Sequence, residues 1–364
     1  MASRPPLSPT TMPTGNPTSA SQPQPNVVTT ADGIRYIDIQ GWRIASRKQP
    51  ISASDTIEHY EQQLGFPIPE MIFGSNYLRI THQASGLALE WNAWDALGQV
   101  DKDLRNSAWL QVAHAKEWSN YRLETSSNSS SGVDLTTKAK SPALAGTATT
   151  TATKGGMGTT ALDTAGPFTS ATEMEQVTKK YDWTYSTTYP GTLIRPPGNP
   201  TLEFQPTETL GINYDRLKLQ EPILFFDDFI LYEDELADNG ISLVNVKVRV
   251  MSFGFFILQR FYLRVDGVAF RLFDTRVYHE FGQPFLVREC LANESGFEGM
   301  VQRLPRTNDR HRQPQISLLA DSAWVAHILA NSPGTPIQDY VQGGTNTSAS
   351  SFAYRRTVEK LDLP

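Results

Sequence analysis

Cysteine is nearly absent from this sequence, because Cys290 is the one cysteine among 364 residues. A single thiol excludes an intramolecular disulfide framework and a multi-cysteine zinc site. A basic surplus is also missing: 32 lysine and arginine residues face 38 acidic ones, and the formal net charge is −6. Nucleic-acid-binding domains usually carry a basic surface, so we expect no nucleic-acid partner.

Long apolar runs are missing as well. No segment approaches the roughly 18 consecutive apolar residues that cross a bilayer. The N-terminal stretch MASRPPLSPTTMPTG is rich in proline and lacks the apolar region of a secretory signal. We therefore expect no membrane association. Together with the lone cysteine, this favours a cytoplasmic or nuclear location, where thiols stay reduced.

The common catalytic signatures are missing too: a P-loop, a G-x-G-x-x-G fingerprint, a G-x-S-x-G elbow and an H-E-x-x-H pair. Among the histidines only the triplet Tyr278-His279-Glu280 suggests a site. If His82 and Asp95 lie near His279, these residues would suit a metal-dependent hydrolase. A strand sends His279 and Glu280 to opposite faces, however. We therefore favour ordinary surface or core-edge residues, and we expect no metal and no cofactor.

Low-complexity composition marks segments that bury too little apolar surface to order themselves. Residues 1–32 are rich in proline, serine and threonine and are predicted to be a disordered tail. Residues 125–172 are predicted to be a disordered insertion inside one domain spanning 33–330, since a long surface insertion costs little closure entropy. Residues 331–364 are predicted to be a mostly irregular C-terminal tail.

Local patterns predict several elements of secondary structure. Apolar spacing predicts a helix over 55–64 that starts with Asp55 in a capping box. Alternating valines predict a half-buried strand over 244–250. Asp321 is predicted to cap a helix near the C-terminus. Two further strands are predicted at 77–81 and 87–91.

Asp266-Gly267 lies between two apolar runs and predicts a β-hairpin, because both central residues of a type I′ turn need positive φ. With a two-residue turn, Val265 would pair with Val268. One face would then be apolar core: Val265, Leu263, Phe261, Val268, Phe270 and Leu272, ending at Gln259 and Asp274. The other face would be basic and aromatic, in contact with solvent or a partner: Arg264, Tyr262, Arg260, Ala269, Arg271 and Phe273.

Long segments of the chain resemble the TIPRL-type regulators of the TOR pathway. The matching strings are PEMIFGSNYLRITH (69–82), LEWNAWDAL (89–97), YDWTYSTTYPGTL (181–193), ILFFDDFILYEDELADNGISLVNVKVRV (223–250) and RFYLRVDGVAFRLFDTRVYHE (260–280). The resemblance implies an α+β, mainly β fold: a curved antiparallel β-sandwich with peripheral helices.

The same resemblance implies a function. It points to a non-catalytic regulator that binds catalytic subunits of type 2A, type 4 and type 6 protein phosphatases and modulates TOR signalling. The TOR-linked regulatory subunit of those phosphatases is a further implied partner, and a monomer is expected outside the complex. Two alternatives stay open: the metal-dependent hydrolase, and a scaffold that binds only the regulatory subunit.

Phosphatase-contacting positions of the family fall on six residues of this chain, and each has a structural alternative. Asp95 would contact the partner or cap a short helix. Ile212 would be an exposed loop residue that anchors the partner. Leu272 would either contact the partner or pack in the core. Asp274 would contact the partner or end its strand. Arg276 and Arg249 are weaker candidates, because a guanidinium can pair with the carboxylates of an acidic phosphatase tail.

Overall fold

The structure, a computed structural model, describes residues 26–100, 182–305, 316–332, 334–336 and 352–364, together with the backbone of 113–115 and 174–176. The predicted insertion at 125–172 and residues 1–25 of the predicted tail lie outside these residues. The chain divides into two compact units. The larger unit comprises Met1–Gln99, Thr187–Ile337 and Thr347–Pro364. The smaller unit comprises Val100–Ser186 and Gln338–Asn346, and there the strands β7 (Ala113–Ala115) and β8 (Met174–Gln176) pair in antiparallel fashion.

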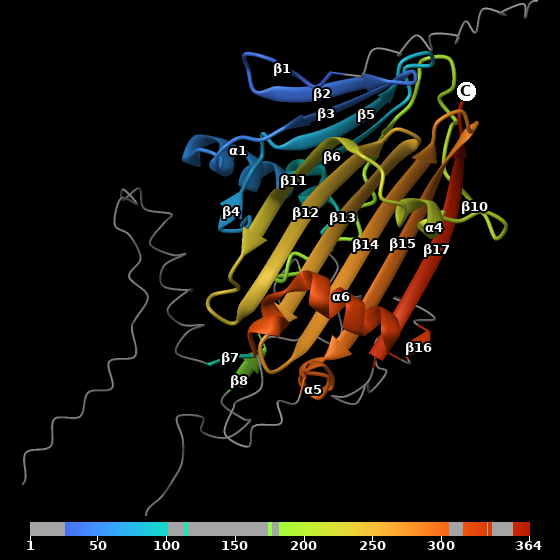
Figure 1. The fold of residues 1–364 in the computed structure, drawn as a ribbon. Coiled ribbons are helices and arrows are strands. Elements are labelled where there is room, and N and C mark those ends of the chain that lie inside the picture. Colours follow the sequence, from blue (N-terminus) through green and yellow to red (C-terminus); the bar gives the residue numbers. More distant parts are fainter. Residues whose placement is uncertain are drawn as a thin grey trace, which may run out of the picture. The chain divides into compact units, whose positions relative to one another are not determined.

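Two sheets form the larger unit, so the predicted mainly β fold is confirmed (Figure 1). The small sheet has six antiparallel strands in the order β1-β2-β3-β5-β6-β9. The strands predicted at 77–81 and 87–91 are both present in it, as β5 and β6. Its strands are β1 (Val28–Thr29), β2 (Ile34–Ile39), β3 (Trp42–Arg47), β5 (Tyr77–His82), β6 (Ala88–Asn92) and β9 (Thr192–Ile194).

The large sheet runs in the order β10-β17-β15-β14-β13-β12-β11-β4, and β16 pairs with β17 in parallel. The valines of 244–250 alternate in it as predicted, because their side chains are buried between the sheets. Its strands are β4 (Met71–Ile72), β10 (Gln205–Pro206), β11 (Ile223–Asp234), β12 (Gly240–Met251), β13 (Gly254–Val265), β14 (Ala269–Glu280), β15 (Phe285–Gly296), β16 (Thr335–Pro336) and β17 (Phe352–Asp362).

The predicted hairpin is present as β13–β14, but its predicted register is wrong by one residue. Val265 pairs with Ala269, so three residues form the loop. Within that loop Gly267 has φ +72°, whereas Asp266 has no positive φ, so the turn is not type I′. A shift of one residue moves every β14 side chain to the opposite face relative to β13. Asp274 therefore lies opposite Arg260.

One face of the large sheet, here called the inner face, packs on the small sheet. Trp42 of β3 contacts Phe255 of β13 and His279 of β14, with ring centroids 5.2 and 4.9 Å apart. Asp227 of β11 is buried and accepts hydrogen bonds from Arg35, at 3.1 Å, and from Ser46. Apolar contacts and an ion pair between the buried Asp227 and the partly exposed Arg35 thus join the two sheets.

Helices cover both ends of the opposite, outer face of the large sheet (Figure 1). At one end Tyr262 and Leu272 pack with Val325 and Leu329 of α6 in an apolar cluster. At the other end the segment that contains α4 packs Ile212 against Tyr278 and Val287. The helical segments of the unit are α1 (Ser54–Leu64), α2 (Ala93–Gly98), α4 (Tyr214–Leu217), α5 (Phe297–Val301), α6 (Ser322–Asn331) and the 3₁₀ helix η1 (Ile316–Ala320).

The helix termini agree only in part with the sequence. Helix α6 begins after Asp321 as predicted, and the Asp321 carboxylate accepts from the Ala323 and Trp324 amides. Helix α1 is also present, but its N-cap is Ala53, and Asp55 accepts from the adjacent Thr56 amide instead of forming a capping box. None of the helices in the described ranges is long and apolar enough to cross a membrane.

Candidate protein-binding site

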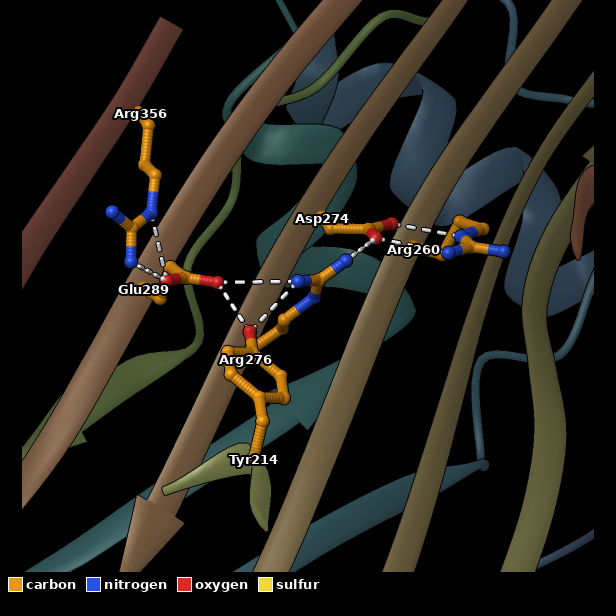
Figure 2. Close-up of polar contacts among 6 residues, drawn as sticks. All are labelled: Tyr214, Arg260, Asp274, Arg276, Glu289 and Arg356. Carbon is orange, nitrogen blue, oxygen red and sulfur yellow. Dashed lines mark hydrogen bonds and ion pairs between the residues drawn. The ribbon is translucent and has the colours of Figure 1, made fainter. Parts of the chain in front are cut away.

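Charged side chains gather in the middle of the outer face, between the two ends covered by helices. They come from adjacent strands: Arg260 of β13, Asp274 and Arg276 of β14, Glu289 of β15 and Arg356 of β17. Figure 2 shows these five side chains linked in a row, with Tyr214 of α4 joining from the side. We call these six residues the arginine cluster.

Asp274 holds one half of the arginine cluster together. Arg260 Nε and Nη2 donate to its two carboxylate oxygens at 2.8 and 2.9 Å, a bidentate pair. Arg276 Nη2 donates to Oδ2 at 3.0 Å. The Asp274 side chain is only 1% exposed, so these guanidinium groups replace the water that it would otherwise bind.

Glu289 organises the other half. Arg276 Nη1 donates to Glu289 Oε1 at 3.1 Å, and Arg356 Nε donates to Oε2 at 2.9 Å. The Tyr214 hydroxyl donates to Oε1 at 2.6 Å and accepts from Arg276 Nη1 at 2.8 Å. Burial, together with the hydrogen bond to Glu289, raises the pKa of Tyr214 to about 12. Tyr214 therefore stays a neutral donor, and its hydrogen bonds hold α4 against the sheet.

Charge does not balance within the arginine cluster. Three guanidinium groups (Arg260, Arg276 and Arg356) meet two carboxylates (Asp274 and Glu289), which leaves one positive charge. Burial alone would disfavour the charged form of Arg276, but Asp274 and Tyr214 outweigh it and raise the Arg276 pKa. Arg356 is the exposed end of the arginine cluster, because 53% of its side chain is exposed. An acidic group from a partner can approach there.

Of the six residues predicted from sequence, Asp274 and Arg276 belong to the arginine cluster. Leu272 is 1% exposed and packs under α6, in agreement with its core alternative. Ile212 is 8% exposed, so the expectation of an exposed loop residue is wrong. It is buried because the segment around α4 folds back onto Tyr278 and Val287.

Asp95 and Arg249 lie elsewhere in the larger unit. Asn92, and not Asp95, caps α2, since its side chain accepts from the Asp95 amide at 2.8 Å. The Asp95 carboxylate accepts from Asn92 Nδ2 at 3.0 Å and from Thr192 Oγ1. Arg249 donates to the Leu217 carbonyl at 3.3 Å and so supports α4.

Glu289, Arg356 and Tyr214 were not among the residues predicted from the sequence. A three-residue hairpin loop would have placed Arg260 opposite Asp274 and so revealed one ion pair. The strands that carry Glu289 and Arg356 were not predicted. The segment 331–364, expected to be mostly irregular, contributes the eleven-residue strand β17.

The residues proposed for a hydrolase do not form a metal-binding group. His82 and His279 both contact Trp42, with ring centroids 5.0 and 4.9 Å from it. Their Nδ1 atoms bond to Ser85 and to the Phe285 carbonyl. Throughout the described ranges, no three His, Cys, Asp or Glu residues lie together as metal ligands.

Comparison with known proteins identifies relatives of this chain. The model of the TIP41-like family matches residues 71–301. The chain is 34% identical over 309 residues to the type 2A phosphatase activator TIP41 of Saccharomyces cerevisiae, covering 84% of this chain and 74% of that protein. It is 35% identical over 265 residues to the TIP41-like protein of Homo sapiens, covering 72% of this chain and 78% of the human protein. The type 2A phosphatase activator tip41 of Schizosaccharomyces pombe is 27% identical over 291 residues, covering 79% of this chain and 91% of that protein. This chain belongs to the TIP41-like family.

Proposed function

We propose that the chain is a non-catalytic regulator that binds the catalytic subunits of type 2A, type 4 and type 6 protein phosphatases and modulates TOR signalling. It would act in the cytoplasm and the nucleus, as a monomer outside the complex, and the TOR-linked regulatory subunit would be an additional partner. Two relatives are named type 2A phosphatase activators. The observation that carries the proposal is the arginine cluster, a preorganised and largely buried set of ion pairs that carries one unbalanced positive charge and reaches the surface at Arg356.

The arginine cluster suits a protein partner better than a small substrate. Its Arg356 end is exposed, and its side chains are already held by neighbours, so little conformational entropy is lost on binding. Arginine is enriched at protein interfaces because its planar guanidinium pairs bidentately with carboxylates. In this proposal an acidic segment of the phosphatase binds at Arg356 and Arg276, beside Asp274.

The remaining predicted positions take supporting roles in this proposal. Ile212 and Leu272 are buried at the two flanks of the arginine cluster, where they fix the segment around α4 and the α6 cover. Asp95 would form a separate contact from α2, and Arg249 would hold α4 in place.

Calorimetric titration with a purified type 2A phosphatase catalytic subunit tests the proposal. We expect one-to-one binding by the wild type and about tenfold weaker binding by Arg356→Ala, which corresponds to ~1.4 kcal/mol. Arg355→Ala is the matched control, because this neighbouring exposed arginine points to the inner face. Unchanged melting temperatures would show that both variants are folded.

Three outcomes of the titration count against parts of the proposal. No binding by the wild type would contradict it as a whole. Equal losses in Arg356→Ala and Arg355→Ala would move the surface away from the arginine cluster. Binding to the regulatory subunit without binding to the catalytic one would favour the scaffold alternative.

A further inference from the structure

Strand β11 forms one edge of the large sheet along most of its length (Figure 1). It pairs with β12 on one side, whereas on the other side β4 pairs with it only at Tyr232 and Glu233. No further strand of the described ranges pairs with β11, so its first half, from Ile223 to Phe229, has no neighbouring strand there. Such an edge presents backbone donors and acceptors to which another strand can bond.

The hydrogen bonds of β11 show which backbone groups face this edge. The Phe226 carbonyl accepts from Arg35 Nη1 at 3.4 Å. The Ile230 carbonyl accepts from Asn76 Nδ2 at 3.0 Å. Since neither donor belongs to β12, both carbonyls point away from β12. Alternate residues of a strand face the same way in an antiparallel pair, so the backbone groups of Asp228 face the edge as well.

A β-bulge places two exposed apolar side chains on the same face of this edge. The register shifts between Ile223 and Phe225, so that Ile223 lies opposite Met251 and Phe226 lies opposite Arg249. Met251 and Arg249 are two residues apart on β12 and share the outer face, which Ile223 and Phe226 therefore share too. Each of these two side chains is 50% exposed. Edge strands are usually protected by charged residues, whereas β11 presents an isoleucine and a phenylalanine.

The inner side of the same edge carries an unbalanced positive charge. Arg35 Nη1 and Lys48 Nζ both pair with the Asp227 carboxylate. The Arg35 and Lys48 side chains are 41% and 48% exposed, whereas the Asp227 side chain is 1% exposed. Two cations thus share one buried carboxylate, and their exposed parts can pair with a second carboxylate from outside.

We propose that the edge of β11 from Ile223 to Asp228 is a docking site for an extended segment of a partner protein, which adds to the sheet as an antiparallel strand and alternates apolar with acidic residues. Backbone hydrogen bonds give such a complex its affinity, and the alternating side chains give it specificity. The apolar side chains of the segment pack beside Ile223 and Phe226 on the outer face. Its acidic side chains pair with Arg35 and Lys48 on the inner face. The arginine cluster lies on other strands, so this site does not depend on the proposed function.

The peptide SVEVEVS, with fluorescein at its N-terminus and an amide at its C-terminus, tests the proposal by fluorescence anisotropy with the full chain. In an antiparallel pair the residue opposite Phe226 turns its own amide toward β11, and in the proposed complex that residue is a valine. N-methylation of the central valine should therefore weaken binding about tenfold, because a backbone hydrogen bond is lost. N-methylation of a glutamate, whose amide faces away from β11, should be tolerated. The peptide SVKVKVS should bind about tenfold more weakly than SVEVEVS, because its lysines meet Arg35 and Lys48.

Variants of the chain test whether the peptide binds at this edge. Phe226→Ser should weaken binding of SVEVEVS about tenfold, whereas Val268→Ser, which changes a residue of similar exposure (49%) in the β13–β14 loop, should leave it unchanged. Lys48→Gln should weaken binding several-fold at low salt and less at high salt, because salt screens exposed charges. Lys360→Gln is its matched control, since Lys360 is an exposed lysine that pairs with Asp362 on β17.

Amide hydrogen exchange gives an independent readout. Saturating SVEVEVS should slow exchange between Ile223 and Phe229 and leave β17 unchanged, because strand addition protects the amides that face the edge of β11. No binding of SVEVEVS, equal binding of the two N-methylated peptides, or unchanged exchange in β11 would overturn the proposal. A dimer in sedimentation velocity that Phe226→Ser dissociates would also overturn it, because the edge would then be assigned to a second copy of the chain.

Discussion

Asp274 illustrates how a single carboxylate can hold a whole surface in shape. It receives a bidentate pair from Arg260 and a third hydrogen bond from Arg276, and its side chain is almost fully buried. Transferring charges out of water is costly, and only complete hydrogen bonding offsets that cost. The arginine cluster is therefore more valuable for fixing geometry than for net stability.

Removing one partner of this buried pair should cost far more than removing both. We expect Asp274→Leu to lower the free energy of unfolding by about 3–5 kcal/mol, because Arg260 then stays buried without its carboxylate. Adding Arg260→Met should recover much of that loss, since apolar residues of similar size can replace a buried pair. Urea denaturation of both single variants and the double variant measures the coupling.

The exposed pair Arg43–Asp38 is the matched control for that cycle. Its two side chains are 48% and 40% exposed, so water screens the pair and a coupling of only ~0–1 kcal/mol is expected. Additive losses at Arg260 and Asp274 would show that the buried pair is not coupled.

At the scale of single elements, the sequence predicted those helices and strands that a local pattern of residues specifies. The valine alternation of β12 and the Asp321 cap of α6 are both present. β15 was missed because its residues are buried or half-buried on both faces, so apolar and polar residues do not alternate along it. β17 was missed because its centre is Tyr-Arg-Arg-Thr, the charged composition of an edge region.

The β13–β14 hairpin shows why the ion pairs of the candidate site could not be predicted from local sequence patterns. Asp266-Gly267 correctly predicted that a hairpin forms, but the turn type and register depend on the whole sheet. One residue of register decides whether Asp274 meets Gln259 or Arg260. The ion pairs of the arginine cluster follow from that choice, and no local pattern encodes it.

The cap of α6 can be tested directly. Asp321→Ala should lower the free energy of unfolding by about 1 kcal/mol, because the Ala323 and Trp324 amides lose their acceptor. Asp321→Asn should retain most of that stability, since asparagine caps equally well. The midpoint of denaturant unfolding, at constant m-value, measures both variants. A loss as large in Asp321→Asn as in Asp321→Ala would show that charge, and not capping, matters there.

On the scale of the whole larger unit, aromatic rings join the two sheets. Trp42 of the small sheet lies between His82 of the same sheet and His279 of the large one. Burial lowers the pKa of both histidines, and the proximity of His82 lowers that of His279 further. Protonation of these imidazoles therefore destabilises the contact between the two sheets.

This contact predicts how stability depends on pH. A histidine with a lowered pKa in the folded state binds its proton more readily when unfolded, so the unfolded state takes up more protons as the pH falls below ~6.5. The free energy of unfolding should thus be at its full value above that pH and decrease toward pH 5. Denaturant unfolding measured at half-unit steps from pH 7.5 to 5 gives the slope.

Other groups titrate in the same range, so the slope must be compared with that of a variant. Glu70 and Glu233 have pKa values raised by burial and nearby carboxylates, and raised carboxyl values oppose the histidine effect, because the folded state then holds the extra proton. His279→Gln removes one imidazole from the interface and leaves those carboxyls in place. A shallower slope in His279→Gln than in the wild type would identify His279 as a source of the acid sensitivity. Identical slopes would mean that the contact between the sheets around Trp42 tolerates a charged imidazole, and that acid acts on the molecule elsewhere.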